Sequence, residues 1–188
     1  MPFVVWITGL PGSGKSTIAK RLVTLLDASG VKAEYLRLDE FRKEIAPSPK
    51  YTDEERDKVY SELSSRATKL NKEQRNVIVD ATAHKAKFRA DLKALVPDLV
   101  EVYVKCSLET CIERESKRKS GLVAAELYRK ALERRRTGKT FEGLGDVVGV
   151  DVPFEEGSPD LVIESDKAAA EQSAKAIMDM LKRRSFIK

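Results

Sequence analysis

Residues 9–16 read Gly-Leu-Pro-Gly-Ser-Gly-Lys-Ser and match the pattern G-x-x-x-x-G-K-[ST] in full. Residues 3–8 before them are apolar and β-branched, as in a buried strand, and residues 17–26 after them carry apolar side chains at helical spacing. A glycine-rich turn between a strand and a helix start directs backbone N–H groups and the positive end of the helix dipole toward one point. The pattern in this context predicts a loop that binds the phosphates of a nucleotide.

Each residue of this loop has an expected role toward ATP. Lys15 is expected to reach the β- and γ-phosphates, and the Ser16 hydroxyl is expected to bind Mg²⁺. The other phosphate contacts are expected from Gly9, Gly12, Ser13, Gly14 and Thr17. The sequence therefore predicts ATP and Mg²⁺ as cofactors. A glycine-rich turn that matches by accident is the alternative, and the correct flanks on both sides argue against it.

The rest of the chain alternates between strand and helix patterns. Apolar, β-branched runs predict strands at residues 3–8, 33–38, 76–80, 99–105 and 160–164. Helical spacing predicts helices at residues 15–29, 40–45, 53–73, 85–95, 108–117, 124–136 and 167–184. This alternation favours an α/β fold with a parallel sheet covered by helices on both faces. No repeat or Pro/Gly-rich linker divides the 188 residues, so we expect a single domain over residues 1–188.

The composition argues against several other classes of protein. No apolar run approaches the roughly 20 residues that span a bilayer, and the first strand starts near residue 3, so a cytoplasmic location is expected. The net charge of +5 suits polyanionic ligands but does not indicate a nucleic-acid surface. His84 is the one histidine, and Cys106 and Cys111 are the two cysteines, which excludes a four-ligand zinc site made of these residues. We expect reduced packing cysteines, with a redox pair as the open alternative.

A second group of polar residues follows the second predicted strand. Asp39 and Arg42 form a D-x-x-R pattern that places both on one face of a first helical turn. Because ligands bind at the carboxyl ends of strands in open α/β sheets, we expect this turn beside the phosphate loop. Asp39 is positioned to accept the proton of an attacking hydroxyl, and Arg42 to hold the acceptor. The alternative is an N-cap aspartate with a solvent-facing arginine.

The third predicted strand ends in Asp80 after four apolar residues. This pattern is typical of a carboxylate that holds the Mg²⁺ hydration shell. An aspartate that merely caps the strand is the alternative. His84, in the same loop, is interpreted as structural or substrate-contacting, and not as a catalytic base.

Residues 115–150, here called the lid segment, are basic in their first half, glycine-rich in their second half and poor in strand signal. Such a stretch between sheet elements is typical of a mobile lid, and a solvated helical hairpin is the compatible alternative. Arg114 lies just before it and is expected to contact the nucleotide. Phosphoryl transfer needs positive charge around the γ-phosphate. The lid segment offers Arg118, Arg129, Arg134, Arg135 and Arg136, of which we expect one or two to be functional.

Several segments together resemble the adenylylsulfate kinase family, whose members phosphorylate the 3′-hydroxyl of adenosine 5′-phosphosulfate. Residues 5–19 look like that family's opening W-[LF]-T-G-L-S-G-[AS]-G-K-S-T-[IL]-A. Further likenesses run through most of the chain, at residues 101–104, 108–114, 127–131, 149–155 and 159–163. The resemblance implies a P-loop kinase fold with strand order 2-3-1-4-5, ATP and Mg²⁺ as cofactors, and a small anionic substrate.

The departures from the family fall on the acceptor side. The family's D-G-D-N-[VI]-R appears as residues 37–42, which keep the second aspartate as Asp39 and the arginine as Arg42. Arg56 is kept in a run whose asparagine is replaced, Tyr51 retains one aromatic position, and Val147 stands where the family has another aromatic residue. We therefore expect Asp39, Arg42, Tyr51 and Arg56 to bind the acceptor.

The sequence leaves the acceptor open. Adenylylsulfate is the favoured acceptor, and another small alcohol or a polynucleotide 5′-hydroxyl is the alternative. A regulatory ATPase is the alternative from a different class, against which Asp39 and Arg42 argue. A nucleic-acid partner is not favoured, because the chain lacks a basic stripe with interleaved aromatic residues. A homodimer is compatible with the sequence but not indicated by it.

Overall fold

Five parallel strands form the central sheet of this computed structural model, which describes residues 1–47, 49, 51–117 and 126–188. The strands are β1 (Val4–Thr8), β2 (Ala33–Arg37), β3 (Asn76–Asp80), β4 (Val100–Lys105) and β5 (Leu161–Glu164). Their order is β2-β3-β1-β4-β5, and every neighbouring pair runs parallel. All carboxyl ends therefore meet at one edge of the sheet, the edge where open α/β folds bind ligands.

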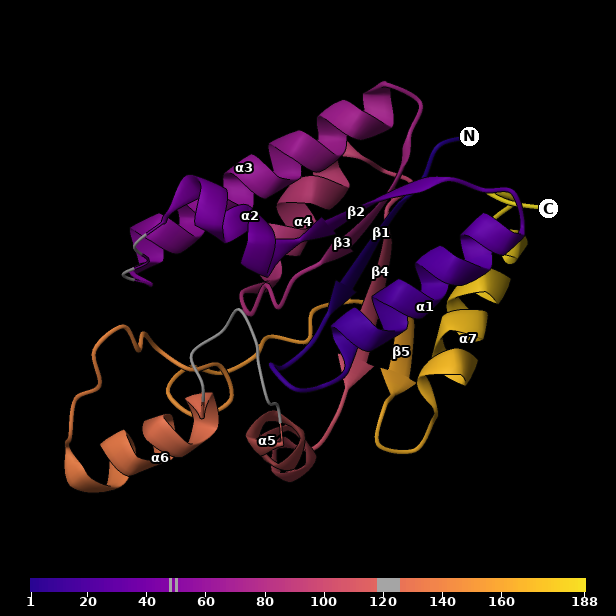
Figure 1. The fold of residues 1–188 in the computed structure, drawn as a ribbon. Helices are drawn as coiled ribbons and strands as arrows, with labels where there is room; N and C mark the ends of the chain where they lie inside the picture. The colour runs from indigo at the N-terminus through magenta and orange to yellow at the C-terminus, as the bar shows by residue number, and fades with distance from the viewer. Residues whose placement is uncertain (48, 50, 118–125) are drawn as a thin grey trace.

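Helices cover both faces of the sheet (Figure 1). One face carries α1 (Lys15–Ala28) and α7 (Ala170–Arg183), and the other carries α2 (Leu38–Ile45), α3 (Asp53–Lys72) and α4 (Ala86–Leu95). The central strand β1 is buried on both sides. Its Val5 and Ile7 belong to the apolar cluster under α1 and α7, whereas Val4 and Trp6 belong to the cluster under α3 and α4. Side chains alternate along a strand, so a continuous apolar run serves two faces.

Two further helices lie beyond the carboxyl edge of the sheet. They are α5 (Leu108–Ser116) and α6 (Leu127–Thr137) (Figure 1). A third apolar cluster joins them to the phosphate loop, with Cys111 from α5, Tyr128 and Ala131 from α6, and Val147 from the segment that returns to the sheet. The Tyr128 hydroxyl donates to the Pro11 carbonyl at 2.8 Å. The helices after β4 are thus attached to the loop residues themselves.

The predicted fold class and strand order are confirmed. The second helix starts earlier than expected, because helical backbone follows β2 directly at Leu38, whose buried side chain joins the cluster under α3. The last helix begins later than expected, at Ala170, where the Gln172 side chain accepts from the Ala169 N–H at 3.2 Å. The predicted helix at 124–136 starts in residues outside those described, and the described helix is Leu127–Thr137. The single domain over residues 1–188 stays a prediction.

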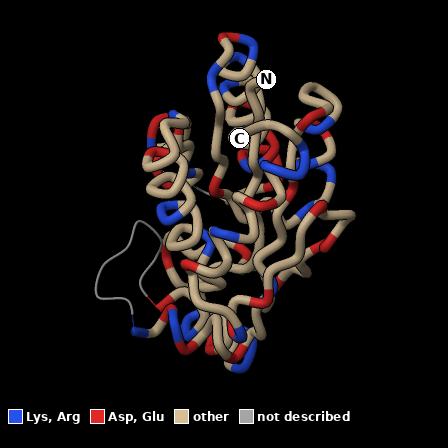
Figure 2. Tube along the Cα trace, turned by 90° about the vertical axis from the view of Figure 1, so that its right-hand side faces the viewer, with Lys and Arg blue, Asp and Glu red and all other residues tan. Residues whose placement is uncertain are grey.

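Charges of both signs are interspersed along the described trace (Figure 2). Among the helices that the structure describes, none combines the length and the apolar character needed to cross a lipid bilayer.

Candidate active site

The loop between β1 and α1 has a backbone that only glycine fits at two positions. Gly9 has φ +145° and Gly12 has φ +82°. A Cβ at Gly9 would lie 2.4 Å from the Val104 carbonyl oxygen, and one at Gly12 would lie 2.5 Å from the Cys111 carbonyl oxygen. Because real Cβ atoms do not approach that closely, the sequence needs glycine here to seat the loop against β4 and α5.

The side chain of Lys15, at the start of α1, reaches back to the first residues of the loop. Its side chain is buried, and its Nζ donates to the carbonyl oxygens of Gly9 at 3.0 Å and Leu10 at 2.8 Å. Gly14 is the N-cap of α1 and has no side chain to accept from the first turn. Backbone N–H groups of a helix start and a lysine ammonium thus share one small volume, which is the arrangement that binds polyphosphate.

The side chains of Arg114 and Ser165 donate hydrogen bonds to the backbone of the loop. The Ser13 carbonyl accepts from the Ser165 hydroxyl at 2.6 Å and from Arg114 Nη1 at 3.3 Å. Arg114 Nη2 also donates to the Ser165 carbonyl at 2.8 Å. Within the described residues, the buried Ser13 hydroxyl has no hydrogen-bond partner. A buried polar atom without a partner is costly, and a phosphate oxygen would satisfy it.

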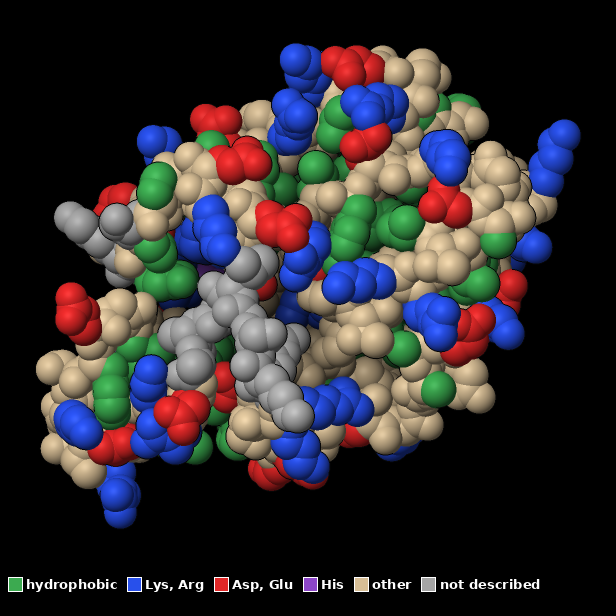
Figure 3. Space-filling model, viewed as in Figure 1, with side chains coloured by type: hydrophobic (Ala, Val, Ile, Leu, Met, Phe, Trp, Pro, Cys, Tyr) green, Lys and Arg blue, Asp and Glu red, His purple; other side chains and the backbone are tan. Residues whose placement is uncertain are grey.

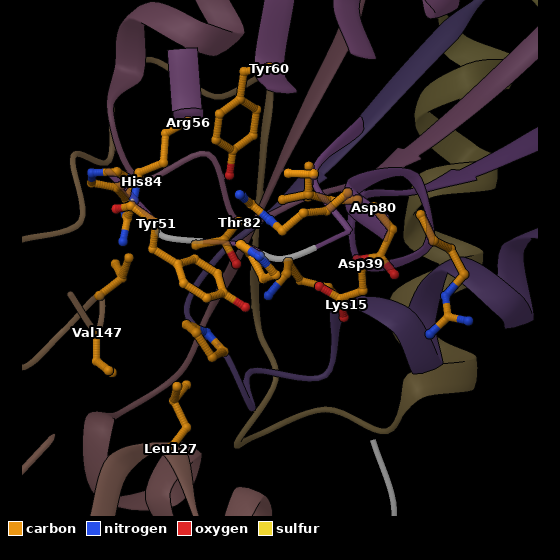
Figure 4. Close-up of a pocket in the computed structure, with 18 of the residues that line it drawn as sticks. Lys15, Asp39, Tyr51, Arg56, Tyr60, Asp80, Thr82, His84, Leu127 and Val147 are labelled. Carbon is orange, nitrogen blue, oxygen red and sulfur yellow. Dashed lines mark hydrogen bonds between the residues drawn. The ribbon is translucent and has the colours of Figure 1, made fainter. Parts of the chain in front are cut away.

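A cavity of about 370 Å³ opens beside the loop, at the carboxyl edge of the sheet. It brings together residues from β2, α2, α3, the loop after β3 and the lid segment (Figure 4). In the space-filling view, a hollow separates the α2–α3 side of the molecule from the α6 side, and Lys and Arg side chains lie at its rim (Figure 3). The lining includes Lys15, Ser16, Asp39, Arg42, Tyr51, Arg56 and Asp80, all of which the sequence singled out.

Asp39 lies in the first turn of α2 and lines the cavity (Figure 4). The N-cap of this helix is Arg37 and not Asp39, so the capping alternative for Asp39 is wrong. A carboxylate in the same cavity as Lys15 can orient or deprotonate a hydroxyl that attacks the γ-phosphate.

Asp80 ends β3 and is buried in the cavity wall. Its carboxylate accepts from the Tyr35 hydroxyl at 2.8 Å. Ser16, Asp80 and Thr82 all offer oxygen atoms to the cavity, the ligand type that Mg²⁺ prefers. The described residues hold no group of three or more His, Cys, Asp or Glu that could bind a metal unaided. The donor set therefore fits a Mg²⁺ ion that arrives with the nucleotide phosphates.

The predicted acceptor residues form one connected group. Arg42 pairs with Glu55 at 3.0 Å and stacks over the Tyr51 ring at 5.1 Å from its centroid. Arg56 is buried, and its guanidinium donates to the carbonyl oxygens of Tyr51 at 3.1 Å and Asp146 at 2.7 Å. These contacts tie the start of α3 to the lid segment. They also show that Arg42, which lines the cavity, is already paired with an anionic side chain, that of Glu55.

Other cavity residues escaped the sequence analysis. Tyr60 lies four residues after Arg56 and so on the same face of α3, a spacing that was available in the sequence. Its hydroxyl accepts from the Ala83 N–H at 2.8 Å. Thr82 comes two residues after Asp80. His84, which the sequence analysis interpreted as structural or substrate-contacting, also lines the cavity. Burial, with the nearby Arg56 and Lys85 charges, lowers its pKa to about 4.

Most lid arginines that the structure describes bind protein groups. Arg134 donates to the carbonyl oxygens of Leu144 and Gly145, each at 3.0 Å, and to Asp151 at 2.6 Å. Arg135 donates to the Val150 carbonyl at 3.3 Å, and Arg129 pairs with Glu126 and Glu133. Arg118 lies outside the described residues.

The parallel sheet has strand order 2-3-1-4-5, and a glycine loop with a buried lysine connects its first strand to the first helix. A cavity lined by carboxylates lies beside this loop. These features together define the class of P-loop phosphotransferases. The model of the adenylylsulphate kinase family matches residues 1–164. The chain belongs to this family and is an ATP-dependent phosphotransferase.

Individual relatives agree with this assignment. The adenylyl-sulfate kinase of Bacillus licheniformis is 33% identical over 186 residues, which cover 95% of this chain and 84% of that protein. A solved structure of the Mycobacterium tuberculosis APS kinase CysC in complex with AMPPNP and APS is similar with a TM-score of 0.79 and 27% identity, covering 96% of this chain and 98% of that one. A probable bifunctional SAT/APS kinase 2 of Sorangium cellulosum is 30% identical over 186 residues, and the chain spans 29% of its length.

Proposed function

We propose that this protein transfers the γ-phosphoryl group of ATP to the 3′-hydroxyl of adenosine 5′-phosphosulfate, with Mg²⁺ as the metal. The observation that carries the proposal is the single cavity in which the phosphate loop, Asp39 and the group of Arg42, Tyr51 and Arg56 meet. The structural likeness to an APS kinase whose solved complex holds AMPPNP and APS supports the same pair of substrates.

The donor residues act on the triphosphate. Gly12 and Lys15 line the cavity, and Lys15 neutralises charge on the transferring group. Gly9, Ser13, Gly14 and Thr17 do not line it and would complete the loop around the phosphates. Ser16 and Asp80 would hold Mg²⁺, which when bound neutralises negative charge between the β- and γ-phosphates. Arg114 would act on the nucleotide through the loop, because its Nη1 donates to the Ser13 carbonyl.

The acceptor residues act on the other substrate. Asp39 orients the attacking hydroxyl and accepts its proton. Arg42 and Arg56 hold the anionic part of the acceptor, and Tyr51 stacks on its base. An acceptor anion must share Arg42 with Glu55, because the two are already paired.

A coupled ADP-release assay tests the acceptor. The panel is adenylylsulfate, 5′-hydroxyl oligonucleotides and phosphorylated metabolites that carry a free hydroxyl. We expect turnover of adenylylsulfate above the rate of ATP hydrolysis without acceptor. If only another panel member is phosphorylated, the proposed acceptor is wrong and the assignment as a kinase stands. If no acceptor accelerates ATP hydrolysis, a regulatory ATPase is favoured.

We also propose that the lid segment, residues 115–150, of which 118–125 lie outside the described residues, closes over bound substrates. The support is the attachment of this segment to both halves of the site, through Tyr128 at Pro11 and through Asp146 at Arg56. Limited proteolysis should cut the segment in the free protein, and an ATP analogue with acceptor should suppress the cutting. Equal cutting in both states would contradict closure.

A cytoplasmic location and a homodimer stay predictions. The free thiols of Cys106 and Cys111 are typical of a reducing compartment.

A further inference from the structure

Tyr35 lies beside the phosphate loop and has no part in the proposed function so far. In the β2–β3 register, Tyr35 is the partner of Ile78, and Arg37 is the partner of Asp80. Cross-strand partners in a sheet point to the same face, and so do residues two apart on one strand. Tyr35 and Ile78 both pack in the apolar cluster under α1. The sheet register therefore brings Tyr35 and Asp80 to the face covered by α1, which has Ser16 in its first turn.

The contacts of the Tyr35 hydroxyl follow from this placement. It donates its one proton to Asp80 Oδ2 at 2.8 Å. Its oxygen can then only accept. The hydrogen bond links Tyr35 on β2 to Asp80 at the end of β3, one of the two residues that would hold Mg²⁺.

This link limits how the two groups can move. Asp80 is 6% exposed, and a carboxylate buried to that extent is stable only with hydrogen-bond partners. Holding Oδ2 fixes the plane of the carboxylate and with it the direction of Oδ1. Groups that orient metal ligands in this way contribute to metal affinity without touching the metal.

We propose that Tyr35 is a positioning residue of the Mg²⁺ site, which holds the Asp80 carboxylate in the arrangement that binds Mg²⁺ with ATP. The inference rests on the proposed function, because it assumes that Ser16 and Asp80 serve the metal.

The test is calorimetric binding of a non-hydrolysable ATP analogue over a series of Mg²⁺ concentrations and in EDTA. Tyr35→Phe keeps the ring and removes the hydroxyl. We expect the Mg²⁺ concentration for half-maximal enhancement of binding to rise about tenfold, while affinity in EDTA stays unchanged. Thermal unfolding of each variant confirms that it is folded.

The matched control is Tyr103→Phe. Tyr103 is also a strand tyrosine near a carboxylate, that of Glu156, but Glu156 does not line the cavity, whereas Asp80 does. This variant should titrate like the wild type. In an Asp80→Asn background, Tyr35→Phe should have no additional effect, because Tyr35 acts through Asp80.

Three results would overturn the inference. One is an unchanged Mg²⁺ titration in folded Tyr35→Phe. Another is an equal loss of binding with Mg²⁺ and in EDTA, which would make Tyr35 a residue of the nucleotide pocket alone. The third is an additive effect in the Asp80→Asn background. A wild-type protein whose analogue binding does not respond to Mg²⁺ would instead overturn the metal assignment in the proposed function, and the inference with it.

Discussion

The two sides of the cavity are held in different ways. On the donor side, the loop is fixed mainly through its backbone: Gly9 and Gly12 press against carbonyl groups of β4 and α5, and the Ser13 carbonyl accepts from Arg114 and Ser165. On the acceptor side, contacts made by side chains hold the cavity residues in place. Arg42 depends on Glu55, and Arg56 reaches Asp146, which is 90 residues away in the chain.

This difference decides how easily each side can change its ligand. A loop built from backbone N–H groups and tight glycine contacts keeps its phosphate site when other side chains are replaced. A wall built from paired arginines can change its acceptor when one partner changes. We therefore expect the donor side to define the class of enzyme and the acceptor side to select the substrate.

The largest expected effect is on the donor side. Lys15→Ala removes the ammonium that stabilises charge on the transferring phosphoryl group, and we expect kcat to fall about a thousandfold. The fold should survive, because the glycine contacts and the Ser13 carbonyl contacts still hold the loop. Turnover measured beside circular dichroism checks this, with the exposed Lys20→Ala on the same helix as control. Near-normal turnover in a folded variant would contradict the kinase assignment.

Asp39→Asn tests the carboxylate that is proposed to accept the proton of the attacking hydroxyl. Asparagine keeps the shape but cannot accept the hydroxyl proton, so we expect kcat to fall about a hundredfold and ATP affinity to change little. Steady-state kinetics and direct ATP binding separate the two quantities. Glu40→Gln is the control, because Glu40 is the exposed neighbouring carboxylate. A collapse of ATP affinity with an unchanged rate per bound ATP would make Asp39 a metal or structural residue.

Gly145→Ala tests the acceptor side alone. A Cβ at this position would lie 2.2 Å from the Tyr51 Cβ, so Tyr51 must move and Arg56 loses its hold on the Tyr51 carbonyl. We expect the KM for the acceptor to rise severalfold, with ATP affinity unchanged. Gly143→Ala is the control, because its added Cβ meets nothing within 4 Å and brings only the backbone strain of φ +71°, without displacing Tyr51. Gly12→Ala should give the opposite pattern and lower the affinity for ATP. If Gly145→Ala affects ATP and the acceptor equally, the division of the cavity into two sides is contradicted.

The same difference explains what the sequence could predict. The phosphate loop is eight consecutive residues between a strand and a helix, and the alternation of apolar runs gives the parallel sheet around it, so both were predictable. Asp39 and Asp80 were predictable as cavity residues because they follow strands whose carboxyl ends meet at one edge.

Long-range contacts were not predictable in the same way. Nothing local to Arg56 indicates that it donates to the Asp146 carbonyl, and nothing local to Arg42 selects Glu55 as its partner. The link from Tyr35 to Asp80 depends on which residues pair across β2 and β3, and that register is a property of the folded sheet. Motif patterns identify residues that act through their neighbours in sequence, and not residues that act through neighbours in space.

The smallest expected effect is a pH dependence of stability at His84, in the cavity wall between the two sides. Burial, helped by the Arg56 and Lys85 charges, lowers the pKa of His84 to about 4, so the folded protein keeps a neutral imidazole at pH 7. The unfolded chain takes up the proton near the ordinary pKa of about 6.5. Between these values the unfolded state binds more protons, so stability contributed by His84 is present above pH 6.5 and is lost as the pH falls toward 4. Urea unfolding at a series of pH values should show a shallower decline for His84→Gln than for the wild type over this range, because the carboxylates titrate alike in both. Identical declines would mean that His84 is solvated and titrates normally in the folded protein. The cavity wall would then be more open than the 4% exposure of His84 indicates.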